Sequence, residues 1–218
     1  MTFNSYLILD FLHILLFAYW LGPDWGVFVS GRRVADENLS REERLRFLKS
    51  SVAIDIFPRS SIVLIIAVGL TLASMGGYIA ISTLALAAIW LVATVWLLLV
   101  WLTGYILSPG PLKARFDSVH VALRHAVTAC LLGVGIYSLV MGKPIANDWL
   151  AVKFILVAIL IAMGSVLRVI VGGWVRDLTG APGSEGTIAR SYGYTRKLVV
   201  TFWLVSISIA FLGVTKPF

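Results

Sequence analysis

Six long apolar stretches constrain the fold of this chain more than any other feature. Each is close to the roughly 20 residues that a helix needs to cross a bilayer core of about 30 Å. They cover residues 6–29, 60–78, 81–107, 119–141, 149–171 and 197–214. With 59% hydrophobic and 13% charged residues among 218, little sequence remains for a separate soluble domain. The sequence therefore predicts an all-α integral membrane protein, a six-helix bundle that forms one polytopic transmembrane domain over residues 1–218.

The positive charges are unevenly distributed around these stretches. Of the 18 Lys and Arg residues, only Lys143, Lys153 and Lys216 do not lie in or beside the connections after the first, third and fifth stretches. Because basic connections stay in the cytoplasm, both termini are expected on the periplasmic side of a bacterial inner membrane. The net charge of +7 then indicates the membrane topology, with a lipid bilayer that has anionic headgroups as the partner. It does not predict a nucleic-acid partner.

The first stretch places a carboxylate and an imidazole inside a lipid-buried helix. Asp10 and His13 are three residues apart and share a helical face. Both groups are costly in hydrocarbon, so each is expected to face the bundle interior. Lys153 enters the fifth stretch from the same side at a comparable depth, given the 1.5 Å rise per residue. We expect these three residues to meet in one layer, where His13 is either a ligand or proton-handling group or a polar anchor for packing.

A second polar group precedes the fourth stretch, in the segment KARFDSVHVALRH. Asp117, His120 and Arg124 lie within two turns on one helical face. This face suits a propionate, a quinone headgroup or an anionic lipid, and the alternative is an ordinary belt of interfacial side chains. His120 and His125 point about 140° apart, so they do not form the i, i+4 pair that chelates one metal.

Two features of the first stretch and the following loop predict local structure. Gly22, Pro23 and Gly26 predict local unwinding beside Asp24. Asp24 is expected to pair with an arginine, with a proton or cation path as the alternative. The motif from Ser40 to Glu43 is a capping box that begins a short amphipathic helix at 40–52, resting on the bilayer interface or on the bundle.

Further predictions concern pairs and repeats. Asp55 and Arg59 are four residues apart and are expected to form a salt bridge. The segments VGLTLASMGG at 68–77 and VGIYSLVMGK at 134–143 indicate a parallel repeat in which the second to fifth stretches form a four-helix core. The glycine-rich segment 174–197 is predicted to be a mobile connection. The single cysteine, Cys130, excludes an intrachain disulfide.

Short motifs resemble two bacterial membrane protein families. Leu12, His13, Trp20 and Gly22, the segment PRSSIVLIIAVGLTLA, and the segment DWLAVKFILVAIL with Lys153 are similar to segments of CopD-type copper-resistance proteins and HemJ-type protoporphyrinogen oxidases. The HemJ-like resemblance implies His13 as an axial ligand of haem b and Lys153 as its partner. The CopD-like resemblance implies copper passage. The chain differs from the HemJ-like pattern in having six predicted spans instead of four, with the lysine in the fifth.

The leading hypothesis from these observations is a haem-b-binding or redox-linked membrane subunit. His13 is its ligand and metal-binding residue, Lys153 and Asp10 are polar neighbours, and the Asp117, His120, Arg124 and His125 region is an inner anion or quinone site. Its electron partner is a quinone or another redox protein. The alternatives are a CopD-like copper transport protein and a non-catalytic anchor that recruits a partner enzyme through 40–52. The sequence leaves a homo-oligomer open.

Overall fold

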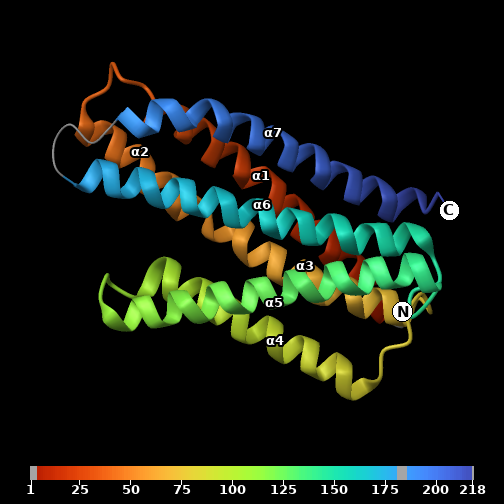
Figure 1. Cartoon of the computed structure of the whole chain (residues 1–218). Coiled ribbons are helices and arrows are strands. Elements are labelled where there is room, and N and C mark those ends of the chain that lie inside the picture. The colour runs from red at the N-terminus through yellow and green to blue at the C-terminus, as the bar shows by residue number, and fades with distance from the viewer. Residues whose placement is uncertain (1–3, 181–185, 218) are drawn as a thin grey trace.

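The computed structural model describes residues 4–180 and 186–217 and is an all-α bundle (Figure 1). Within this described part, six helices are long and apolar enough to cross a membrane, which confirms the predicted fold class. The elements are α1 (Ser5–Val34), α2 (Arg41–Ile54), α3 (Ile56–Met75), α4 (Thr83–Trp101), the π-helix η1 (Leu102–Ile106), α5 (Pro111–Met141), α6 (Asp148–Thr179) and α7 (Gly186–Thr215).

Local chemistry explains where several of these helices begin and end. The side chains of Asn4 and Ser82 accept hydrogen bonds from the backbone N–H groups of the first turns of α1 and α4. Pro111 starts α5, where its missing N–H costs nothing. Gly142 ends α5 in the left-handed conformation at φ 66°, which glycine adopts without strain.

Two predictions of irregular structure are wrong. Helix α1 continues through Pro23 without unwinding, because neighbouring helices in a bundle support a proline-containing span. Most of the predicted connection at 174–197 is helical, since α6 extends to Thr179 and α7 begins at Gly186. Residues 181–185 of that prediction lie outside the described residues.

The main hydrophobic core lies between α3, α4, α5 and α6, the four helices in which the sequence predicted it. Its buried members include Val63, Trp96, Leu131 and Phe154, one from each helix. Helices α5 and α6 approach closely at Gly135, where an added Cβ would lie 2.9 Å from the carbonyl oxygen of Ala151. Helices α1 and α7 flank this core through a second cluster of Trp20, Leu160, Phe202 and Ile209. The parallel repeat itself stays a prediction.

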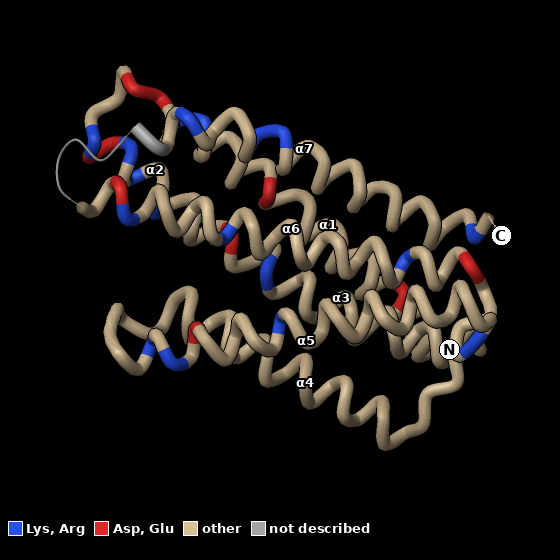
Figure 2. The backbone as a smooth tube through the Cα atoms, in the orientation of Figure 1, with Lys and Arg blue, Asp and Glu red and all other residues tan. Residues whose placement is uncertain are grey.

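Charged residues gather at one end of the bundle (Figure 2). We call it the basic end; it comprises α2, the C-terminal turns of α1 and α6, and the N-terminal turns of α5 and α7. The opposite end, which carries both chain termini, is called the terminal end (Figures 1 and 2).

Helix α2 closes the basic end. Its capping box is confirmed: the Ser40 backbone N–H donates to Glu43 Oε2 at 2.9 Å, and the Glu43 N–H donates to Ser40 Oγ at 3.3 Å. Buried Leu48 packs with Val34 and Trp174 in a cluster of its own. The apolar face of α2 therefore rests on the bundle, one of the two placements that the sequence allowed.

Candidate functional site

Three arginines from three different helices converge toward the basic end. We call Arg59 of α3, Arg124 of α5 and Arg168 of α6 the arginine cluster. Arg168 interacts electrostatically with both other guanidiniums, Arg124 interacts with Arg59, and all three interact with His120. Like charges inside a membrane bundle raise its free energy, so they need a compensating partner.

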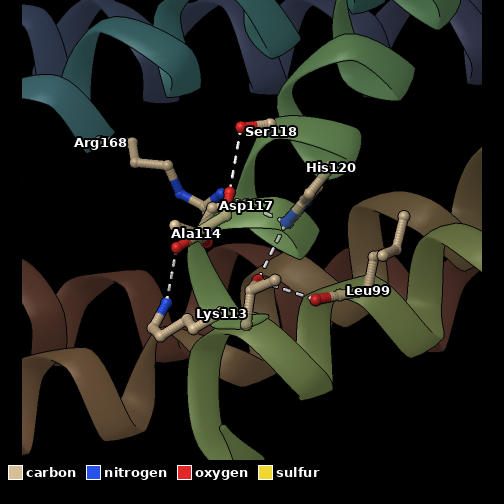
Figure 3. Close-up of polar contacts among 8 residues, drawn as sticks. Leu99, Lys113, Ala114, Asp117, Ser118, His120 and Arg168 are labelled. Carbon is tan, nitrogen blue, oxygen red and sulfur yellow. Dashed lines mark hydrogen bonds and ion pairs between the residues drawn. The ribbon is translucent and has the colours of Figure 1, made fainter. Parts of the chain in front are cut away.

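His120 lies at the centre of this cluster and is 2% exposed. Its Nδ1 atom is 3.3 Å from Arg168 Nη1 and 3.1 Å from Thr103 Oγ1, and Figure 3 shows Arg168 directed toward the imidazole. A guanidinium only donates hydrogen bonds, so its bond to Nδ1 requires a lone pair on that nitrogen. This bond assigns the ring hydrogen to Nε2 and makes the imidazole neutral.

The π-helix η1 positions Thr103 for this contact. The Thr103 hydroxyl donates a 2.8 Å hydrogen bond to the carbonyl oxygen of Leu99, one turn earlier, and its Oγ1 atom also lies beside His120. Single-turn π-helices are rare and occur frequently at functional sites. Here the π-turn aims a hydroxyl at the one histidine that the arginine cluster surrounds.

The members of the arginine cluster differ in their partners. Arg59 forms an ion pair with Asp55, which confirms the predicted salt bridge. Arg124 and Arg168 form no ion pair with any described residue, and Arg124 Nε is buried without a hydrogen-bond acceptor. Two buried or half-buried guanidiniums are therefore not neutralised by a carboxylate of the described chain.

A cavity of about 180 Å³ adjoins the cluster. Of the described residues that line it, the charged ones are Asp24, Asp55, Arg59, Arg124, Arg168 and Arg196. Four guanidiniums against two carboxylates leave an excess of two positive charges. The remaining lining is mostly apolar and aromatic, including Trp20, Trp96 and Phe202, with the polar side chains of Ser51, His120 and Thr195. The cavity thus offers a cationic side and a hydrocarbon side.

Asp24 lines this cavity but is not paired as the sequence predicted. Its Oδ2 atom accepts a hydrogen bond of 2.6 Å from the indole Nε1–H of Trp203, and it forms no ion pair within the described part of the chain. The Trp203 ring stacks on Trp25, with centroids 5.3 Å apart. The expected arginine partner was wrong because the indole of α7 occupies the position beside the carboxylate.

The structure brings together only part of the predicted inner site. His120 and Arg124 both line the cavity. Asp117 is within electrostatic range of His120 but forms its ion pair with Lys113, at 2.8 Å between Nζ and Oδ2 (Figure 3). His125 is exposed and is not among the residues that line the cavity.

Sequence analysis missed Arg59, Arg168 and Thr103 as members of this site. Arg168 carries the only detectable signal, because it lies within the apolar run from Leu160 to Val171. An arginine near the end of a membrane helix ordinarily extends its charged group toward the interface. Instead it turns inward to His120.

A second layer of buried charge lies toward the terminal end. Lys153 interacts electrostatically with His13, so the structure brings these two predicted residues together. The His13 ring lies against Gly69 of α3, with Cε1 2.9 Å from the position of an added Cβ. Lys153 Nζ lies 2.7 Å from the equivalent position at Gly213 of α7. We call His13 and Lys153 the outer pair.

Asp10 does not belong to the outer pair. It is exposed and interacts electrostatically with Lys216, whose ammonium donates a 2.7 Å hydrogen bond to Tyr78 Oη. This bond raises the pKa of Lys216 above its ordinary value. Asp10 therefore belongs to a surface cluster at the terminal end.

The surroundings of His13 do not fit a haem in this arrangement. Its Nδ1 and Nε2 atoms lie 3.5 and 3.9 Å from the Cβ position of Gly69, so α3 occupies the space that a macrocycle around the nitrogen would need. His13 is also not among the residues that line the central cavity. Among the described residues, no group of three or more His, Cys, Asp or Glu side chains forms a metal site. Haem b and copper stay predictions from the sequence.

Comparisons with protein-family models, with curated proteins and with solved structures found no match to this chain. The resemblance to CopD-type and HemJ-type proteins therefore stays an expectation, and the argument for function rests on the geometry described above.

Proposed function

We propose that the protein is a membrane-embedded binding protein for an anionic ligand, held in the central cavity beside the arginine cluster. The observation that supports this proposal is the convergence of three guanidiniums from α3, α5 and α6 on one cavity that only two carboxylates line among the described residues. The protein is multi-pass, and its partner surface is the lipid bilayer.

The arginines hold their charges inside the bundle. Arg168 is hydrogen bonded inward to His120, and Arg124 Nε is buried. Charged side chains inside membrane proteins almost always pair with another group or face a water-filled cavity. An anion in the cavity supplies the missing partner, and guanidinium groups bind oxyanions through paired hydrogen bonds.

The size of the cavity limits what it encloses. At about 180 Å³ it is smaller than the roughly 300 Å³ at which pockets for drug-sized ligands begin. The cavity therefore encloses a charged headgroup and not a whole macrocycle. The aromatic and aliphatic lining suits an apolar continuation of the same ligand.

The charge asymmetry of the bundle orients the site. Because basic connections stay in the cytoplasm, we place the basic end on the cytoplasmic side of a bacterial inner membrane and both termini in the periplasm. The ligand then enters from the cytoplasm or from the inner leaflet.

Native mass spectrometry of the purified protein tests this function. Wild-type protein retains a bound anion after detergent exchange, and Arg168→Gln loses most of it because one guanidinium is removed from the cavity. Arg115→Gln is the matched control, since Arg115 is exposed at the same end of α5 and does not line the cavity. Equal retention in all three proteins, or none in the wild type with added anionic lipid, would contradict the proposal.

A further inference from the structure

We infer that the charged group of the ligand is a phosphate monoester dianion, carried either on a lipid or on a free molecule. This inference rests on the proposed function and specifies its ligand. It follows from the charge, the direction and the surroundings of the arginine cluster.

The net positive charge of the cavity lining matches a ligand group with two negative charges. With both lining carboxylates ionised, four guanidiniums, of which that of Arg196 is exposed, leave an excess of two positive charges. A carboxylate or a phosphate diester carries a single negative charge and leaves one positive charge of the cavity lining uncompensated. A phosphate monoester carries about −1.5 to −2 at neutral pH and compensates both.

The directions of the donors favour a tetrahedral anion over a planar one. Arg59, Arg124 and Arg168 belong to three different helices, and all three line the cavity. The acceptor positions of a carboxylate lie in one plane, whereas the terminal oxygens of a phosphate point in three directions. Donors from three helices therefore fit a phosphate better.

Each guanidinium keeps donors for the ligand. Arg168 uses Nη1 for its bond to His120, and Arg59 uses Nη2 for its ion pair with Asp55. A guanidinium has five N–H donors, so both retain free ones, and Arg124 Nε has no acceptor. His120 thereby acts as a positioning residue, because its lone pair fixes the direction of Arg168 without adding charge.

The rest of the cavity admits hydrocarbon next to the phosphate. Trp20, Leu160 and Phe202 line it, and all three belong to the buried cluster between α1, α6 and α7. This lining is compatible with an acyl chain, although a small free phosphate ester also fits the polar side. The experiment must therefore separate the two sources.

Binding to purified wild-type protein in a maltoside detergent tests the inference with four probes: short-chain phosphatidate, the matching phosphatidylglycerol, glycerol 3-phosphate and succinate. We expect phosphatidate to bind at least about tenfold more tightly than phosphatidylglycerol. Arg168→Gln and Arg124→Gln should each weaken phosphatidate by about tenfold or more, the usual effect of losing a charged hydrogen bond. Arg115→Gln should bind like the wild type.

Arg168→Lys keeps the inference testable if the glutamine variants do not fold. It keeps the charge but loses the planar fork, so it should fold and still bind phosphatidate several-fold more weakly than the wild type. Retained thermal unfolding temperature, measured on the same samples, separates loss of binding from loss of fold.

The outcomes distinguish the inference from the proposed function. Tight binding of phosphatidate with weak binding of glycerol 3-phosphate supports the inference and identifies a lipid as the carrier of the phosphate. Comparable binding of both supports the inference and identifies a free molecule as the carrier. Phosphatidylglycerol or succinate binding as tightly as phosphatidate, in an Arg168-dependent manner, overturns the phosphate monoester and leaves the anion-binding function standing. Binding of every probe that is unaffected by Arg168→Gln, or no binding at all, overturns both.

Discussion

The outer pair and the arginine cluster are two layers of charge in one bundle, and they differ in packing. At the outer pair, helix glycines at 69 and 213 make room for the ring of His13 and the ammonium of Lys153, and the groups fill that space. At the arginine cluster, the charged groups border a cavity of about 180 Å³. A buried charged side chain that fills the space between helices contributes to packing. Buried charged side chains around a cavity are available to bind a ligand.

The largest effect expected from this comparison is a gain of stability at the outer pair. Among the described residues Lys153 has no hydrogen-bond or ion-pair partner. The groups with which it interacts electrostatically are the ammonium of Lys216 and the ring of His13. Lys153→Met keeps the length of the side chain and removes a buried charge, which costs about 2.5–3.5 kcal/mol at the centre of a membrane helix and less toward its end, where Lys153 lies. We expect about 2 kcal/mol of added stability, measured by denaturant unfolding in detergent.

Lys143→Met is the control, because Lys143 is exposed at the same end of the bundle. It should change the free energy of unfolding by less than about 0.5 kcal/mol. If Lys153→Met instead destabilises the protein, the ammonium stabilises the packing against Gly213, which contradicts the expected gain.

The next effect separates members of the arginine cluster. Arg59→Gln breaks the ion pair with Asp55, whose side chain is 24% exposed, and leaves a half-buried carboxylate without its partner. The cost should lie between those of exposed and fully buried pairs, at about 1–2 kcal/mol. Arg124→Gln removes a guanidinium that has no ion pair and should be neutral or stabilising in protein stripped of ligand. An equal loss of stability in Arg59→Gln and Arg124→Gln would contradict the conclusion that Arg59 forms an ion pair and Arg124 does not.

Much of the fold follows from the sequence because span length and helix caps are local properties. The six apolar stretches, the Ser40–Glu43 box and the Asp55–Arg59 pair each depend on neighbours along the chain, and each is present in the structure. The pairing of His120 with Arg124 on one face follows in the same way from helical periodicity.

The rest of the site depends on how the helices are rotated against one another. Whether Arg168 reaches the interface or His120 is decided by the orientation of α6 against α5, which no spacing within either helix reports. Asp24 meets an indole 179 residues away for the same reason. The π-turn that aims Thr103 at His120 has no recognised sequence signature, so the sequence did not indicate this residue.

A smaller effect tests the hydrogen bonds behind the arginine cluster. Thr103→Val keeps the shape of the side chain but removes the hydroxyl, whose single hydrogen is shared between the Leu99 carbonyl oxygen at 2.8 Å and His120 Nδ1 at 3.1 Å. We expect a loss of about 1 kcal/mol in the free energy of unfolding, the usual value of one such bond. Thr94→Val, on the exposed part of α4 where the hydroxyl bonds only to its own helix, is the control and should have little effect. Equal effects of the two substitutions would remove Thr103 from the site.

The smallest effect concerns α2, which supplies Leu48 and Ser51 to the cavity lining and lies at the basic end, whereas the outer pair lies toward the terminal end. Hydrogen bonds from the Ser40 side chain and backbone lower the pKa of Glu43 below its ordinary value of 4.5. A lowered folded pKa means that the contribution of Glu43 to stability is complete above pH 4.5 and is lost as the pH falls through the folded value. Hydrogen-exchange protection factors should therefore decline in α2 on acidification, but not in α3 around Gly69. Glu43→Gln cannot titrate at this position and should show a pH-independent protection of α2, so an unchanged acid response in that variant would assign the loss of protection to another group.

Because α2 also lines the cavity, selective unfolding of α2 would loosen the packing around the arginine cluster and leave the outer pair packed. This difference is the one that the two layers of charge predict.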